Sequence, residues 1–125
     1  MSQNFKKLTL SQEPRQELHD ALGLTGCEVS VNVLPAGVAV PFVHSHKKNE
    51  EVYLVLEGKG ELYIDGKVES IAAGDAFVIR PAGHRAIRAA ANQAIRYVCI
   101  QTKSDSLEGF TMTDAEINDD KAPWL

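Results

Sequence analysis

The sequence lacks any long apolar run, and it has few residues of the kinds that mark special classes of protein. Its 125 residues include two cysteines and five prolines, and aromatic residues make up 6%. No run approaches the ~20 apolar residues that a membrane-spanning helix needs. The first residues, MSQNFKK, also lack the apolar core of a secretion signal. We therefore expect a cytoplasmic protein with no membrane partner.

The two cysteines, Cys27 and Cys99, permit a single disulfide. Both lie in apolar, strand-like stretches, where a free cysteine commonly behaves as a small buried hydrophobic residue. In the cytoplasm thiols are kept reduced. We therefore expect two free thiols.

A basic surface is also lacking, because the formal net charge is −4. Six of the 17 acidic residues but only one of the 13 basic residues lie within residues 104–125. The rest of the chain is close to neutral, so it has no electrostatic footprint for nucleic acid or for an anionic membrane. We exclude both as partners.

What the sequence does have is the composition of a folded globular protein, with 44% apolar and 24% charged residues. A chain of this length suits one compact core. Near the start, residues 11–22 are compatible with a short helix, with Ser11 as N-cap, Pro14 in the first turn and Gly23 after the end. Tertiary contacts can convert such a segment into a loop or an edge strand.

From Glu28 onward, short apolar or β-branched runs alternate with turn residues, and no helical period appears before the tail. Seven to nine short strands at this spacing predict an all-β sandwich or barrel, because antiparallel strands bury one face in this way. The predicted strands cover residues 28–34, 38–46 (interrupted at Pro41), 51–56, 61–64, 67–72, 76–80, 85–89 and 94–101.

His44 and His46 are two residues apart on a predicted strand, so both side chains project from the same face and can converge on one ion. Glu51 begins the next strand and can reach the same point. Two imidazoles and one carboxylate are the ligand set of many non-haem iron sites, and they also suit manganese, nickel, copper or zinc. An isolated His-x-His on a surface needs no metal, so the context decides.

That context resembles the first signature motif of the cupin family: a glycine, His-x-His, a glutamate and a second glycine. Four residues separate His46 from Glu51, and six separate Glu51 from Gly58, as in the family pattern. The lead gap from Gly37 to His44 is one residue longer than the pattern, which a β-bulge can absorb. Glu50 competes for the ligand role, but neighbouring residues point to opposite faces, and the distance to Gly58 favours Glu51.

The second family motif is only partly present. Gly74 and the sequence Pro81-Ala82-Gly83 resemble its start, but Ala86 stands where the family has its fourth ligand, a histidine. His84 is the nearby alternative, displaced from that position by ~6–7 Å along a strand. Either His84 ligates through a local bulge, or it is a turn histidine at the rim of the pocket.

Three further features leave alternatives open. Arg88 has the same parity as residue 86, so it either points inward, where it could bind a carboxylate or phosphate, or is a solvated outer-face residue. Phe42 and Tyr53 either pack in the core or line the pocket. Asn32, a polar residue in an apolar strand, either lies on the solvent-exposed face or makes a polar contact in the cavity.

The resemblance implies an all-β double-stranded β-helix (jelly-roll) barrel of residues 28–103, preceded by an N-terminal segment, 1–27, that packs on the barrel. An acidic tail of residues 104–125 would lie over the barrel or over a partner subunit, since a homodimer is common in the family. Outer-face apolar residues such as Val31 or Val33 would be consistent with that dimer.

The implied function is binding of a divalent transition metal (Fe, Mn, Ni, Cu or Zn) by His44, His46, Glu51 and, less directly, His84. The protein would then act on a small polar metabolite as an oxygenase, isomerase or lyase. The alternative from a different class is a barrel that binds or senses a sugar or small acid without turnover and without a metal, and the fold alone cannot choose between the two.

Overall fold

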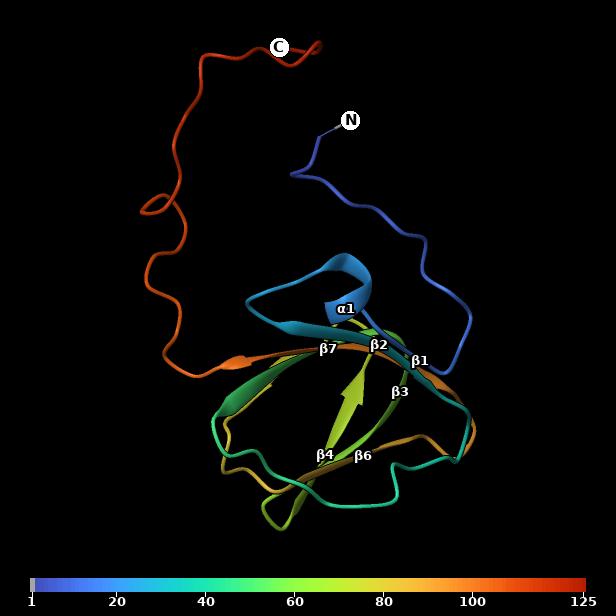
Figure 1. The fold of residues 1–125 in the computed structure, drawn as a ribbon. Helices are drawn as coiled ribbons and strands as arrows, with labels where there is room; N and C mark the ends of the chain where they lie inside the picture. The colour runs from blue at the N-terminus through green and yellow to red at the C-terminus, as the bar shows by residue number, and fades with distance from the viewer. Residues whose placement is uncertain (1) are drawn as a thin grey trace.

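The computed structural model describes residues 2–125, and its regular structure is almost entirely antiparallel β (Figure 1). The main sheet path runs in the order β1-β2-β7-β3-β4, while β5 and β6 also pair with β3. This confirms the prediction of an all-β barrel. The elements are β1 (Arg15–Glu17), α1 (His19–Leu22), β2 (Glu28–Leu34), β3 (Asn49–Ile64), β4 (Lys67–Ala72), β5 (Ala76–Ile79), β6 (Arg85–Ala89) and β7 (Ile95–Lys103).

Strand β3 links the two sides of the barrel. Its first part, up to Gly58, pairs with β5 and β7, and its second part, from Lys59, pairs with β4 and β6. A register shift between Val55 and Glu57 marks the change of direction. Gly58 has φ 78°, and a Cβ there would overlap the carbonyl oxygen of Ala94, so only glycine fits this bend.

The prediction of separate strands over residues 51–56 and 61–64 is therefore wrong. Gly58 and Gly60 lie between the two predicted ranges, and they allow one bent strand to stay hydrogen-bonded on both sides. Residues 38–46, predicted as a strand, form only two isolated bridges, Ala39 to Arg88 and His44 to Arg85. Pro41 cannot donate to a ladder, which accounts for the interruption.

The N-terminal segment contains a short edge strand followed by a single helical turn. β1 pairs with β2, and only residues 19–22 of the helix predicted over 11–22 are helical. Gly23 ends that turn in the left-handed conformation, as the sequence indicated. Pairing with β2 satisfies the backbone of β1, and this outweighs a weak local preference for helix.

The core lies between the two sides of the barrel. Val31 is buried and not on an exposed outer face as predicted, because β1 pairs with β2 beside it. Cys27 and Cys99 are free thiols, and Cys99 is buried in the core. The core cluster consists of Tyr53, Val55, Leu62, Ile71, Ile79, Ile87, Ala89, Ile95, Tyr97 and Cys99.

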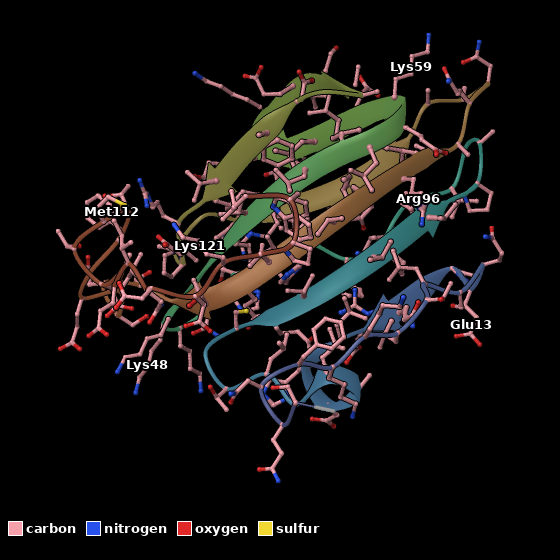
Figure 2. The ribbon with its side chains drawn as sticks, turned by 90° about the horizontal axis from the view of Figure 1, so that it is seen from above. Glu13, Lys48, Lys59, Arg96, Met112 and Lys121 are labelled. Atoms are coloured by element: carbon pink, nitrogen blue, oxygen red, sulfur yellow. The ribbon has the colours of Figure 1, made fainter. Side chains whose placement is uncertain are left out.

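The tail after β7 runs away from the barrel and does not lie over it (Figure 1). Figure 2 shows strands β1, β2, β7 and β3 side by side, with Met112 beyond one end of them and Lys59 at the other end. Apolar tail side chains, including those of Ile117 and Trp124, are exposed. Among residues 2–125, no helix is long and apolar enough to cross a membrane.

Candidate metal centre

The two histidines are held in place by their backbones. His44 exchanges two 3.0 Å hydrogen bonds with Arg85 on β6, and the His46 amide donates to the Pro81 carbonyl oxygen at 2.8 Å. The rings are half-buried, with centroids 5.1 Å apart and an angle of 82° between their planes, while Ser45 between them faces outward. The two histidines therefore project from the same face, as predicted from their spacing of two residues, although the segment is not a continuous strand.

Glu51, on β3, completes the group. One ligand atom from each of His44, His46 and Glu51 lies within 4.8 Å of the others, and Glu51 is only 5% exposed. The His46 Nε2 atom lies 3.4 Å from Glu51 Oε2. Glu50 points the other way and accepts a hydrogen bond from Arg80 at 2.9 Å, so Glu51 and not Glu50 faces the imidazoles.

The Glu51 carboxylate is held by two further donors. The Tyr53 hydroxyl donates to Oε1 at 3.1 Å, and the Cys99 thiol donates to Oε2 at 3.3 Å. Burial, together with the neighbouring Glu51, raises the pKa of Tyr53 and raises the pKa of Cys99 to about 12. Both groups therefore stay protonated and able to donate at neutral pH.

Tyr53 is itself fixed by stacking on Phe77, with ring centroids 5.0 Å apart and an angle of 8° between the planes. The sequence offered a signal for its role, because residues 51 and 53 share one face of a strand. The Cys99 contact had no such local signal, since Cys99 lies opposite Tyr53 only through the pairing of β3 with β7.

Arg85 is a site residue that the sequence argument missed. Its side chain is 1% exposed, and its Nη1 atom lies 3.3 Å from Glu51 Oε1. Its Nη2 atom donates to the Arg80 carbonyl oxygen at 2.8 Å. On β6, residues 85, 87 and 89 are buried, whereas 88 and the preceding residue 84 are exposed, so the inward parity is the opposite of the one counted from the motif.

The same alternation explains where His84 and Arg88, the other candidate site residues, lie. His84 is exposed, and its backbone pairs with Asp65, so the structure does not bring His84 to the group of three ligands. Arg88 is an outer-face residue that forms an ion pair with Glu61. Ala86, at the motif's histidine position, offers no ligand atom.

A cavity of about 470 Å³ opens above this group, within the size range of small-molecule sites. Phe42 and Tyr53 line it, as one of the two interpretations held. Asn32 also lies in it, accepting a hydrogen bond from Arg15 at 2.8 Å and donating to the Ser30 hydroxyl at 3.0 Å. The walls are thus mostly apolar, with polar groups at a few fixed positions.

The three side chains fit a divalent transition metal. His44 Nδ1 and His46 Nε2 are buried and have no hydrogen-bond partner among the described residues, which is unusual for buried polar atoms. Burial, with a smaller contribution from Arg85, lowers the pKa of His44, so its imidazole is neutral and can ligate. Imidazole and carboxylate donors with open positions are typical of iron and related ions.

Comparison with known sequences and structures agrees with this geometry. The family model described as "Cupin domain" matches residues 30–101. A cupin protein from Bacteroides fragilis is 53% identical, with a TM-score of 0.90, and the match covers 94% of this chain and 99% of that one. No curated protein matches the sequence.

Two more distant structures have names that mention an activity. A candidate sugar phosphate isomerase from Acidithiobacillus ferrooxidans is 26% identical with a TM-score of 0.64, covering 73% of this chain and 59% of that one. A predicted oxalate decarboxylase from Thermotoga maritima is 23% identical with a TM-score of 0.57, covering 68% of this chain and 73% of that one. The second likeness concerns the fold alone.

Proposed function

Because the chain belongs to the cupin family, we propose that it binds one divalent transition metal through His44, His46 and Glu51. In the cavity above the ion it would act on a small polar metabolite. The observation that carries the proposal is the pair of buried imidazole nitrogens that have no hydrogen-bond partner within residues 2–125, beside a buried carboxylate. A metal ion would satisfy both nitrogens at once.

The protein's own residues prepare the site in a defined way. The backbone bonds of His44 and His46 fix the two rings, and Tyr53 and Cys99 orient the Glu51 carboxylate by donating one hydrogen bond to each oxygen. Apolar side chains, including that of Phe42, line part of the cavity above the three side chains. When bound, the ion would supply Lewis acidity or oxygen activation.

The reaction class is an oxygenase, isomerase or lyase. The name of the Acidithiobacillus ferrooxidans structure, a sugar phosphate isomerase, supports a small polar substrate without choosing among these classes. With metal-loaded protein, oxygen consumption across phenols, diketones and thiols tests the oxygenase class, and turnover of sugar phosphates tests the isomerase class.

Metal content is the first experiment. Protein purified without a histidine tag and dialysed against Fe, Mn, Ni, Cu or Zn should hold about one ion per chain by elemental analysis, and His44→Ala and His46→Ala should lose it. His19→Ala, at an exposed position, is the matched control. We expect His84→Ala to keep the ion, because His84 is exposed. A folded wild-type protein that takes up none of these ions would overturn the proposal.

A second candidate function is binding of a sugar or small acid without turnover. The observation that favours it is the Arg85 Nη1 atom 3.3 Å from Glu51 Oε1, which gives the carboxylate a cationic partner without any ion. A metal-free, folded protein that still binds a ligand in the cavity would support this alternative.

A further inference from the structure

Arg85 is a buried cation with most of its donors unused. A guanidinium has five N–H groups, and among the described residues that of Arg85 donates one hydrogen bond, from Nη2 to the Arg80 carbonyl oxygen. Its Nε and Nη1 atoms are buried and have no hydrogen-bond partner among the described residues. A buried charge is ordinarily both paired and hydrogen-bonded, so this arginine has capacity for a further partner.

Glu51 does not use up that capacity. The Nη1 atom lies near Oε1 at 3.3 Å, but Oε1 already accepts a hydrogen bond from Tyr53, and Oε2 lies near Cys99 and His46. One carboxylate is thus shared among an arginine, two hydrogen-bond donors and an imidazole. On the proposed function the Glu51 carboxylate would also ligate the metal. Less of its negative charge would then be available to neutralise Arg85.

The charges around the cavity also indicate that Arg85 can accept an anionic partner. Its charged lining residues are Arg15, Glu28, Glu51 and Arg85, besides the two histidines. Glu28 is turned toward the N-terminal turn, where its Oε1 atom accepts the Leu18 and His19 amides at 3.1 and 2.9 Å. Arg15 is held by Glu17, whose Oε1 atom lies 3.1 Å from Nε, and by Asn32, which accepts a 2.8 Å hydrogen bond from Nη1. The carboxylate and guanidinium left for a ligand are therefore Glu51 and Arg85, and a divalent ion would add two positive charges that a bound anion can offset.

We propose that Arg85 binds the anionic group of the ligand, a carboxylate or a phosphate, so that the metabolite is a small anion held beside His44, His46 and Glu51. This deepens the proposed function and rests on it. Arginine suits this role because its planar fork matches two oxygens of one oxyanion. Arg85 places a cation beside His44, His46 and Glu51, 3.3 Å from the Glu51 carboxylate, and none of His84, Ala86 and Arg88 joins that group.

The test compares anions with neutral analogues of similar size. Zinc-loaded protein freed of unbound zinc is titrated calorimetrically with malonate and malonamide, and with glycerol 3-phosphate and glycerol. We expect at least one anion to bind ten-fold or more tightly than its neutral partner, and the pair that shows this identifies carboxylate or phosphate. Equal affinity within both pairs would overturn the inference.

Variants then locate the anion. Arg85→Gln should weaken binding of the anion about ten-fold or more, and Arg85→Lys should recover only part of the loss, since lysine keeps the charge but not the fork. Arg88→Gln is the matched control, because Arg88 lies on the same strand but faces outward. Unchanged anion affinity in Arg85→Lys and Arg85→Gln would sink the inference. If Arg85→Gln does not fold, as circular dichroism would reveal, Arg85→Lys decides alone.

Zinc content measured on every sample separates the two proposals. A wild-type protein that holds zinc but does not distinguish anion from neutral analogue overturns the role of Arg85 and leaves the metal site standing. A protein that holds no ion overturns the proposed function, and malonate titrated into that metal-free protein then shows whether Arg85 binds an anion independently.

Discussion

Replacing Glu51 by glutamine should destabilise the metal-free protein strongly, because it leaves Arg85 buried without a counter-charge. The Arg85 side chain is 1% exposed, and its Nη1 atom is 3.3 Å from the carboxylate. At an effective dielectric constant of about 20, two unit charges at that distance attract by about 5 kcal/mol. Breaking a buried pair from one side typically costs about 3–5 kcal/mol, and we expect a loss of this size in the free energy of unfolding.

Arg85→Met should cost less, because Glu51 keeps hydrogen bonds from Tyr53 and Cys99. The double variant Glu51→Gln/Arg85→Met should be clearly more stable than Glu51→Gln alone, with a coupling energy of about 2 kcal/mol or more. Urea denaturation in the presence of a chelator measures the free energy of unfolding of the wild type, the two single variants and the double variant. Additive losses, with no recovery in the double variant, would refute the idea that Arg85 depends on Glu51.

Three more outcomes are expected. Gly58→Ala should lower the melting temperature far more than Gly66→Ala, since both glycines have positive φ but a Cβ meets backbone only at Gly58; equal shifts would contradict a bend that only glycine allows. Iodoacetamide at pH 8 should modify Cys27 much faster than Cys99, because burial and Glu51 raise the pKa of Cys99 to about 12. Mass spectrometry measures the two rates of modification, and in the unfolded protein the two rates should become equal. We propose that the tail is a dimer contact, because its apolar side chains, including Ile117 and Trp124, are exposed among the described residues. Light scattering should then give the mass of a homodimer for the full chain and of a monomer after deletion of residues 104–125; an unchanged mass would count against the tail as a dimer contact.

Local patterns in the sequence predict most of the strands. The ranges 28–34, 67–72 and 85–89 match β2, β4 and β6 as they stand, because turn residues bracket each apolar run. The failure over residues 51–64 has a different origin. Whether Gly58 interrupts a strand or bends it depends on pairing with β7 on one side and β4 on the other, and no local window contains that information.

The same distinction applies to the site. His44, His46 and Glu51 are close together in the sequence. Strand alternation allows only one of Glu50 and Glu51 to face inward, and the distance to Gly58 in the family motif selected Glu51. Arg85 lies on a strand whose inward parity is set by its pairing with the second half of β3 and by the bridge to His44. Counting from the motif position at Ala86 gave the opposite parity, so the sequence analysis considered His84 and Arg88 as possible inward residues and did not consider Arg85.

A shift of one residue along β6 exchanges the side chains that face inward with those that face outward. It therefore alters the chemistry expected of this barrel. Had residue 84 or 86 faced the ion with a histidine, the site would hold four neutral or acidic ligands and no cation. With residue 85 facing inward, the site holds three candidate ligands, His44, His46 and Glu51, and a guanidinium 3.3 Å from the Glu51 carboxylate. On the role proposed for Arg85, the ligand of this barrel is an anion, because the inward-facing residue of this strand is a cation and not the neutral histidine of the family motif.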